Sequence, residues 1–447
     1  MAALNIAVIG SGISGLSAAW LLSKQHKVTL FEQDPRLGGH TNTVTVETAD
    51  GAIPVDTGFI VYNERNYPNL TALFTYLGVR TEPTQMTFAV SADKGAFEYA
   101  GSPTRLFGQI SNLFRRRQWQ LVFDLFRFFR TAKRKLTNYP ADISLGAFLK
   151  AENYSDAYIE DHIIPMGAAV WCTSSNAMLD FPAATFIHFY DNHGMLQAVN
   201  QPGWRTVSGG SSKYVARMVA DGKFGTVAGT PVCKVRRMPS CVSVEDADGV
   251  VRMFDQAIIA THADQALQML AEPEADEQEL LGAFSYDRNR TVLHRDKTFM
   301  PRRRRLWQSW NYLKRGEGFE TKLCVTYWMN SLQSLPTETD LFVTLNPPWD
   351  IHPKAIDLEV DYDHPIFDAE AIDAQRRLWS LQGQGGIWFC GGYFGYGFHE
   401  DGLQSGLAVA EQLGRVRRPW EVEDESGRIH ITHDAGEGAD APLAAAE

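Results

Sequence analysis

The stretch "LNIAVIGSGISGLSAAWLLSKQHKVTLFE" (residues 4–32) decides the fold of this chain. It opens with a short apolar run at 5–9. Apolar residues at helical spacing then lead to a second apolar run at 28–31, which Glu32 ends. Three glycines stand between the first run and the helical pattern, at the spacing G-x-G-x-x-G: Gly10, Gly12 and Gly15. The order strand, glycine turn, helix and strand predicts a Rossmann-type unit that binds a dinucleotide.

Each part of this unit has a physical task toward a dinucleotide. Gly10 permits the tight turn, Gly12 lets the backbone approach a pyrophosphate, and Gly15 lets the helix pack closely on the strand. The start of the helix, which includes Ser14, offers N–H groups and a positive dipole end to the phosphates. Glu32 lies about 20 residues after the first glycine, where an acid binds the hydroxyls of the adenosine ribose.

Two further motifs indicate which dinucleotide is bound. The runs "DPRLGGHT" (34–41) and "VDTGFIVYN" (55–63) resemble the Arg-x-Gly-Gly run and the Asp-x-Gly stretch of the amine-oxidase-like flavoprotein superfamily. A simple NAD domain needs neither motif, so the resemblance implies FAD as the cofactor. It also implies four FAD-binding residues: Arg36, Gly38, Gly39 and Gly58.

The C-terminal stretch "WFCGGYFGYGFHEDGLQSGLAVAEQL" (388–413) has the order with which that superfamily closes its FAD site: strand, glycine-rich turn and helix. The helix is expected to aim its positive end at the flavin. Four more cofactor residues are expected here: Gly392, Asp401, Gly402 and Leu403. Three residues are candidates for catalysis or substrate placement: Tyr393, His399 and Glu400. Each also has a structural reading, as packing, backbone pairing or ion pairing.

The middle of the chain implies an interleaved architecture. The stretch "PGWRTVSGGSSKYVARMV" (202–219) resembles the superfamily segment that returns the chain from the substrate domain to the FAD domain. Val232 stands where the backbone meets the adenine in relatives. The expected fold class is α/β, with a Rossmann-like FAD-binding domain interleaved with an α+β substrate domain. The expected segments are 1–75, 205–285 and 380–418 for the FAD-binding domain, 76–204 and 286–379 for the substrate domain, and 419–447 for a disordered acidic tail.

At family level, "YDRNRTVLHRDKTFMPRRRRLWQSWNYL" (286–313) and the C-terminal stretch resemble a bacterial group of NAD/FAD-binding, amine-oxidase-like proteins. Relatives of this group accompany cyclopropane-fatty-acyl synthases, so the resemblance implies a fatty acyl chain as a candidate substrate. Amine oxidases of the superfamily usually keep a lysine near flavin N5. The segment aligned there, 288–296, contains no lysine, which weakens amine oxidation.

Residues 105–136 combine nine Lys or Arg and one acid with many Phe, Leu and Trp. Five apolar residues are expected near one helical face: Phe114, Leu121, Leu125, Phe128 and Phe129. A basic amphipathic helix fits a membrane interface, where its cations meet anionic lipid. The alternative is a helical cover whose apolar face is buried on the substrate domain.

Composition bounds the partners and the location. The net charge of −11 disfavours nucleic acid as a partner. Five scattered cysteines without a CxxC pair indicate neither a disulfide framework nor a metal site, and favour a reducing cytoplasm. Because no apolar run reaches about 18 residues, we expect no membrane span. The expected location is the cytoplasm, with peripheral contact to the inner face of the membrane through 105–136; the oligomeric state stays open.

Three functional hypotheses remain. The first is an FAD-dependent oxidoreductase on a lipophilic substrate, which desaturates an acyl chain or moves its double bond by hydride transfer to flavin N5. The second is a flavin amine oxidase for a small amine or polyamine. The third is a flavin- or lipid-binding protein without catalysis.

Overall fold

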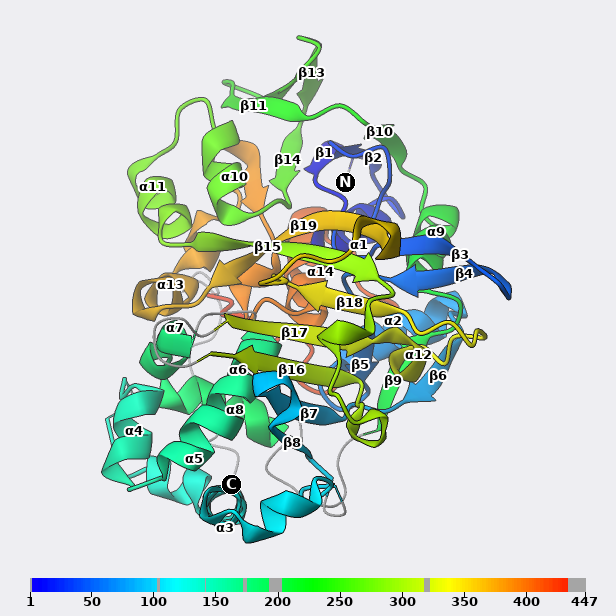
Figure 1. Ribbon diagram of the computed structural model, residues 1–447. Helices are drawn as coiled ribbons and strands as arrows, with labels where there is room; N and C mark the ends of the chain where they lie inside the picture. Colours follow the sequence, from blue (N-terminus) through cyan, green and yellow to red (C-terminus); the bar gives the residue numbers. More distant parts are fainter. Residues whose placement is uncertain are drawn as a thin grey trace.

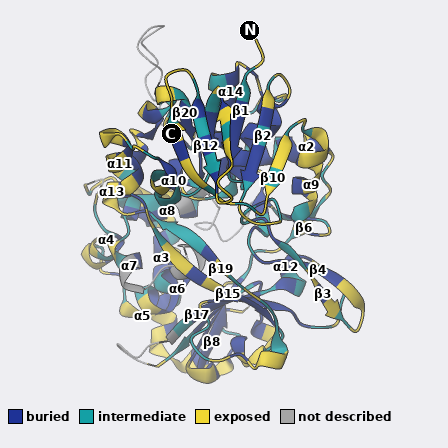
Figure 2. Cartoon of the chain, turned by 90° about the horizontal axis from the view of Figure 1, so that it is seen from above, coloured by how far each residue is buried: buried dark blue, intermediate teal, exposed yellow. Residues whose placement is uncertain are grey.

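A parallel sheet of five strands forms one end of the molecule (Figure 2). The computed structural model describes residues 2–102, 105–140, 142–171, 175–192, 203–316 and 322–432. The strand order in this sheet is β10 (Gly225–Ala228), β2 (Lys27–Glu32), β1 (Asn5–Ile9), β14 (Gln256–Ile259) and β20 (Ile387–Phe389). All neighbouring strands pair in parallel, so the turns that follow their carboxyl ends converge on one edge.

A mixed sheet of seven strands lies beside it (Figure 1). Its order is β19 (Ile356–Ile366), β15 (Ser285–His294), β18 (Phe342–Leu345), β17 (Lys322–Trp328), β16 (Trp310–Arg315), β7 (Phe88–Ala92) and β8 (Phe97–Ala100). Only β16 and β7 pair in parallel among these described strands. Strands from two distant parts of the chain therefore build one sheet.

Three smaller sheets complete the strands. They are β11 (Val232–Arg237), β12 (Val242–Asp246) and β13 (Val251–Phe254); β3 (Thr43–Thr48) and β4 (Gly51–Asp56); and β5 (Val61–Asn63), β9 (Trp204–Val207) and β6 (Thr81–Thr84). In the last of these sheets, β9 pairs with both β5 and β6. It thereby joins β5 and β6, which precede the first strand of the seven-stranded sheet, to the segment after β9, which returns to the parallel sheet.

The helices divide between the two large sheets. Those beside the parallel sheet and its edge are α1 (Ile13–Leu22), α2 (Pro68–Leu77), α9 (Ser212–Asp221), α10 (Ala263–Met269), α11 (Ala275–Gly282), α13 (Ala369–Gln375) and α14 (His399–Gly414). Those on the seven-stranded sheet are α3 (Arg116–Leu136), α4 (Leu145–Ala151), α5 (Asp156–Tyr158), α6 (Ile164–Trp171), α7 (Ser175–Asp180), α8 (Ala183–Asn192) and α12 (Met329–Leu332). Two separate apolar cores follow this division.

The segment after α14 is not a disordered tail as far as the structure describes it. Trp420 stacks on Trp20 at 5.8 Å between ring centroids, and Ile429 is buried in the core of the parallel sheet. Arg428 forms an ion pair of 2.7 Å with Asp401. The prediction of disorder from residue 419 is therefore wrong for 419–432, because aromatic stacking and a buried ion pair offset its polar composition; residues 433–447 lie outside the described part.

Helix α3 buries the face that the sequence indicated, with one correction. Leu121, Leu125 and Phe128 are buried in the core under the seven-stranded sheet. Phe114 does not share this face: it lies in the 3₁₀ turn η2 (Ile110–Phe114) before the helix and is 88% exposed. Among the described helices, none combines the length and the hydropathy that a membrane span requires.

Candidate FAD and substrate site

The turn between β1 and α1 is built around glycines. Gly10 has a φ of +101°, and a Cβ there would lie 2.8 Å from the carbonyl oxygen of Ala260 after β14. A Cβ at Gly15 would collide with the carbonyl of Gly10. Gly12 differs from both: its φ of −60° is ordinary, and nothing lies within 4 Å of an added Cβ. Gly10 and Gly15 are thus required by the fold, whereas Gly12 borders open space.

The second strand brings an acid to the same turn. The Glu32 carboxylate at the end of β2 accepts hydrogen bonds from the Ser11 backbone N–H (2.9 Å) and the Ser11 hydroxyl (2.5 Å). The Asp34 N–H donates to its other oxygen at 3.0 Å. These bonds hold the acid beside the start of α1.

Arg36 fixes the turn that follows β2. Its guanidinium donates to the carbonyls of Gly39 (2.8 Å) and Thr41 (3.1 Å). Gly38 has a φ of +121°, and a Cβ at Gly39 would lie 3.0 Å from the Gly12 Cα. The turn therefore lies directly on the glycine loop of α1.

The next loop is held equally close. A Cβ on Gly58 would collide with the carbonyl of His40, which also accepts the Phe59 N–H at 2.9 Å.

Helix α14 lies against α1 through small residues (Figure 1). A Cβ on Gly402 would lie 2.7 Å from the Ser14 hydroxyl, and one on Gly406 would collide with the Ser14 carbonyl. Gly392 stands in the turn η10 (Gly392–Phe394) between β20 and α14. Both ends of the chain thus contribute a helix start to one edge of the parallel sheet.

These loops enclose a cavity of about 990 Å³ that extends to the seven-stranded sheet. Most of the predicted cofactor residues line it: Gly10, Gly12, Ser14, Glu32, Arg36, Gly39, Gly58, Val232, Gly392 and Gly402. Four do not: Gly15, Gly38, Asp401 and Leu403. Gly15 and Gly38 shape the backbone behind the lining, Leu403 is buried in the core, and Asp401 accepts the Phe398 N–H at 2.7 Å as a helix cap.

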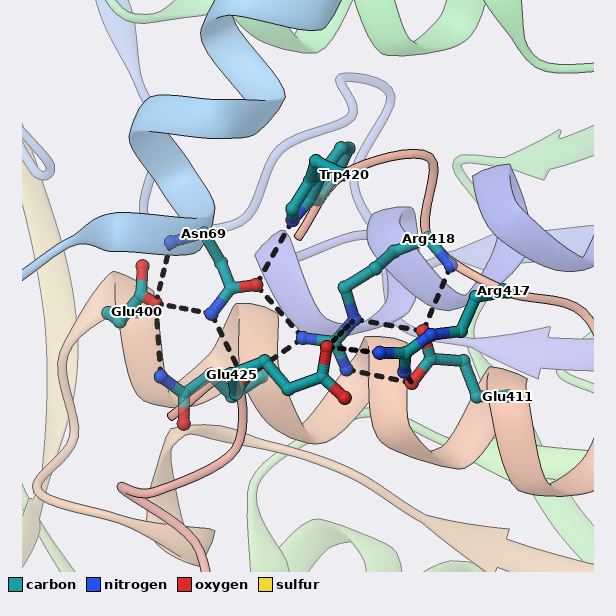
Figure 3. A network of polar contacts seen from close by, with 8 residues as sticks. Asn69, Glu400, Glu411, Arg417, Arg418, Trp420 and Glu425 are labelled. Carbon is teal, nitrogen blue, oxygen red and sulfur yellow. Dashed lines mark hydrogen bonds and ion pairs between the residues drawn. The ribbon is translucent and has the colours of Figure 1, made fainter. Parts of the chain in front are cut away.

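Glu400 is buried outside the cavity, and the structure does not support a catalytic role for it. Its carboxylate accepts the N–H groups of Asn69 and Leu70, both at 3.0 Å, at the start of α2. The side-chain amides of Asn69 and Gln404 donate to it as well, at 2.8 and 3.0 Å. The same network includes Arg418, as Figure 3 shows. Glu400 therefore caps a helix and joins α14 to α2 and to the C-terminal segment.

His399 and Tyr393 do line the cavity. The His399 ring stacks on Phe59 at 3.8 Å, and its Nε2 lies 3.0 Å from the Thr41 hydroxyl and 3.1 Å from that of Tyr214. Burial lowers the pKa of His399 to about 3, so it is neutral at physiological pH and a weak base. Tyr393 is buried, and its hydroxyl has no hydrogen-bond partner among the described residues.

The sequence interpretation missed a histidine cluster on the cavity wall, which we define as His40, His262 and His364. The His40 ring centroid lies 5.6 Å from that of His364 and 6.0 Å from that of His262. Burial, followed by the neighbouring histidines, lowers the pKa of His40 well below its usual value, and its Nε2 has no described partner. One signal was available: His262 follows a buried strand of the parallel sheet, at the edge where ligands bind. No described group of His, Cys, Asp or Glu is arranged to hold a metal ion.

One stretch of the cavity wall is apolar, and we call it the chamber; Asp361, Asp363 and His364 of β19 in the seven-stranded sheet also line the cavity. The lining of the chamber is Ile60, Val61, Met86, Trp310, Tyr327, Leu332, Leu345 and Val360. Among the described residues, no lysine lines the cavity. Arg36, at the glycine loops, is the one basic Lys or Arg residue in the described lining.

The residues present fit FAD. Open space borders Gly12 at the positive end of α1, where a pyrophosphate is held in dinucleotide-binding folds. Glu32 and Val232 line the cavity on the side of the parallel sheet, and the apolar chamber lies on the other. An elongated ligand with a charged middle and a flat aromatic ring suits this arrangement.

Comparison with known proteins agrees with the geometry. Residues 13–309 match the family described as flavin containing amine oxidoreductase. One curated relative, the carotenoid phi-ring synthase of Streptomyces griseus, is 40% identical over 70 residues, which span 15% of this chain and 13% of that enzyme. The match thus covers a small part of both proteins.

Several solved structures share the fold along nearly the whole chain. A putative protoporphyrinogen oxidase from Exiguobacterium sp. 255-15 has a TM-score of 0.65 at 16% identity, with 93% of this chain and 99% of that chain covered. The CLA-producing fatty acid isomerase from P. acnes has a TM-score of 0.65 at 14% identity, with coverages of 92% and 98%. A putrescine oxidase has a TM-score of 0.64 at 15% identity, with coverages of 92% and 99%. At these identities the likeness shows the fold.

Proposed function

We propose a lipophilic substrate for this chain, which belongs to the flavin-containing amine oxidoreductase family and is an FAD-dependent oxidoreductase. The family resemblance, the α/β fold class and the FAD cofactor that the sequence indicated are confirmed. The proposal concerns the substrate: a fatty acyl chain that is desaturated or whose double bond is moved.

The lining of the chamber carries this proposal. The eight residues that define the chamber bear no charge; two acids of the seven-stranded sheet, Asp361 and Asp363, also line the cavity. An acyl chain gains about 0.8 kcal/mol for each CH₂ that it buries in such surroundings. A protonated amine there would have to lose its hydration without a carboxylate to pair with, at a cost of several kcal/mol.

The fold alone does not choose between these substrates, since solved structures of similar fold include both a putrescine oxidase and a fatty acid isomerase. Two acids line the cavity away from the glycine loops, Asp361 and Asp363. Asp361 is exposed and paired with Arg288 at 2.5 Å. Asp361 is therefore neutralised in part at the surface, whereas Asp363 is half-buried and forms no ion pair among the described residues.

We assign the cofactor to the lining residues of the glycine loops. Gly12 and Ser14 would face the pyrophosphate, Glu32 the adenosine ribose, and Val232 the adenine. Arg36 would contribute through the turn that it holds. Gly392 and Gly402 would lie along the flavin side. FAD, when bound, supplies the acceptor for a hydride from the substrate.

The remaining tasks fall to the chamber and its neighbours. The apolar wall would exclude water and hold the reacting C–H bond within about 3–3.5 Å of its acceptor. His399 and the histidine cluster stay neutral near pH 7, so they can donate and accept hydrogen bonds without adding charge. Burial raises the pKa of Tyr393 well above its usual value, so we propose it as a hydrogen-bond donor toward the substrate. Glu400 is excluded from this set.

The test is anaerobic reduction of the purified flavoprotein. Unsaturated and cyclopropane fatty acids, dispersed in detergent, and separately putrescine and benzylamine are mixed with the enzyme, and the flavin absorbance is followed. Bleaching by a fatty acid and not by the amines supports dehydrogenation. A shifted double bond in the recovered fatty acid, without net bleaching, supports isomerisation. Bleaching by an amine alone, or no reaction with either class, contradicts the proposal.

A variant of the chamber sharpens the test. Leu345→Glu places a carboxylate in the apolar wall, which we expect to slow the reaction with fatty acid at least tenfold, because burying a charge there costs more than about 1.4 kcal/mol. Leu345→Met keeps volume and polarity and is the matched control. Flavin content and melting temperature of both variants show whether each is folded.

A further inference from the structure

We propose that one face of the substrate domain docks on an anionic lipid bilayer. This face, which we call the η2–α3 face, consists of six apolar side chains: Ile110, Leu113, Phe114, Trp119, Phe123 and Phe126. It lies at the end of the molecule opposite β11 and β13 (Figure 1). Docking of this face is independent of the substrate class, because it decides where the protein binds and not what it converts.

The exposure of these side chains is concentrated in one short segment. Phe114 is 88% exposed, Phe123 70% and Ile110 65%. Of the 13 large apolar side chains that are exposed in the described part of the chain, six fall within residues 110–126. Scattered exposed apolar residues are normal on a protein surface, whereas a contiguous set marks an interaction site.

The helix itself presents two distinct faces. Leu121, Leu125, Phe128 and Ala132 are buried under the seven-stranded sheet. The exposed aromatic residues Trp119, Phe123 and Phe126 recur at spacings of four and three, so they share the opposite face. The Trp119 ring N–H donates to the Leu113 carbonyl at 2.9 Å, and the Phe126 ring meets that of Phe129 at 6.5 Å between centroids. Phe123 is 70% exposed and has no ring or hydrogen-bond partner among the described residues. The core therefore leaves most of this aromatic surface uncovered.

Cations without carboxylate partners surround the aromatic stripe. Arg116 precedes Trp119 by one turn, and Arg130 and Arg134 continue the stripe after Phe126; all three are exposed. None of the three is within ion-pair distance of an acid in the described residues. By contrast, Arg117, Arg127, Lys133 and Lys135 are paired with Asp161, Asp124, Asp191 and Glu152. The pairing thus neutralises the flanks and leaves the charge around the aromatic residues free.

A second basic segment lies alongside. The guanidinium of Arg305 donates to the carbonyl of Gly108 at 2.6 Å, two residues before η2. Arg305 is exposed and has no acidic partner among the described residues, whereas Arg303 and Arg304 are paired with Glu98 and Asp340. This cation extends the positive charge of the η2–α3 face although the chain as a whole is acidic.

Charge and side-chain type together specify a bilayer. Aromatic rings on an exposed helix enter the boundary between headgroups and acyl chains, while arginines beside them meet anionic headgroups. Each cation near such a surface contributes about 1 kcal/mol, and salt screens this attraction. A protein partner would have to present acids around an apolar groove, and a second copy of this face would place arginines against arginines.

The test is sedimentation of the FAD-loaded protein with vesicles. Vesicles of phosphatidylglycerol and phosphatidylethanolamine are compared with vesicles of phosphatidylcholine alone, at low salt and at about 0.5 M NaCl. We expect binding to the anionic vesicles, a loss of at least tenfold in affinity at high salt, and weak binding to phosphatidylcholine. Equal binding to both vesicle types, or none to either, overturns the proposal.

Variants separate this face from the rest of the surface. Phe114→Ser with Phe123→Ser, and Arg116→Gln with Arg134→Gln, should each weaken binding at least tenfold, because they remove exposed groups without described partners. The matched controls change exposed groups elsewhere, Val251→Ser with Met253→Ser on β13, and Lys234→Gln on β11 with Lys223→Gln between α9 and β10; they should bind like the wild type.

Two further readouts keep the outcomes distinct. Reduction of the flavin by detergent-dispersed fatty acid should be unchanged in the docking variants, so that a failure of the proposed substrate does not count against docking. If ultracentrifugation without lipid shows a dimer that Phe114→Ser with Phe123→Ser dissociates, and vesicles do not bind, the face is an interface between copies of the chain and the proposal is wrong.

Discussion

Replacement of Gly12 by alanine isolates the contact between the glycine loop and the cofactor. Nothing in the protein lies within 4 Å of a Cβ at this position, and its φ of −60° and ψ of 176° suit alanine. A Cβ on Gly406, in contrast, would collide with the carbonyl of Ser14 and the hydroxyl of Ser17. One substitution should therefore affect the ligand alone, and the other the packing of α14 on α1.

The structure sets the expected magnitudes. Gly12→Ala should change the stability of the FAD-free protein by less than about 0.5 kcal/mol, as for a surface substitution that touches nothing. The added methyl group would occupy space that we assign to the pyrophosphate, and overpacking costs about 1–3 kcal/mol. We therefore expect FAD affinity to fall roughly 5- to 150-fold. Gly406→Ala should lose a similar 1–3 kcal/mol from the stability of the FAD-free fold.

The assay needs two measurements on each protein. Thermal unfolding of the FAD-free protein, followed by circular dichroism, reports the fold. Titration with FAD, followed by quenching of flavin fluorescence, reports affinity. Wild-type FAD affinity in Gly12→Ala would refute the placement of the pyrophosphate at Gly12. If Gly12→Ala melts at a temperature as low as that of Gly406→Ala, the claim that open space borders Gly12 is refuted.

Three further substitutions test other parts of the structure. Glu400→Gln should lower the free energy of unfolding by about 1–3 kcal/mol, because the carboxylate accepts four hydrogen bonds. The rate of flavin reduction per bound FAD should stay unchanged. A loss of this rate with intact flavin content would indicate a catalytic role for Glu400. Trp420→Ala should destabilise the fold by about 3 kcal/mol in chemical denaturation, because it removes the stack on Trp20; a neutral result would mean that the C-terminal segment is not packed. Burial lowers the pKa of His162 to about 4 from 6.5, so the folded state resists its protonation and its contribution to stability falls as pH drops from 6.5 to 4. Between pH 7 and pH 4, the free energy of unfolding of His162→Gln should fall by about 3 kcal/mol less than that of the wild type, as measured by urea unfolding at both pH values. An unchanged pH dependence would show that His162 is not buried in its neutral form.

The sequence by itself determined the dinucleotide-binding unit and the flavin. Gly10, Gly12 and Gly15 act within one local strand–turn–helix unit, and the acid that ends the second strand reaches the same turn. Local geometry of this kind is written in the spacing of a few residues, because short-range sterics dictate where only glycine fits. The resemblance of 34–41, 55–63 and 388–413 to known flavoproteins supplied the cofactor for the same reason.

The tertiary structure alone decided which polar residues face the cavity. Glu400 stands beside His399 in sequence, yet its partners Asn69 and Leu70 lie 331 and 330 positions away and withdraw it from the site. The histidine cluster assembles positions 40, 262 and 364, which no local pattern connects. Burial and hydrogen bonding depend on neighbours that only the folded chain brings together.

The amphipathic segment 105–136 shows the same limit of prediction from sequence. Periodicity predicted that one face of α3 would be apolar, and it identified Leu121, Leu125 and Phe128. It could not tell that this face is buried while Phe114 and Phe123 remain exposed, because both sets are equally apolar in sequence. An amino-acid pattern records which side chains avoid water, and only the packing of sheet against helix decides which of them the fold itself covers.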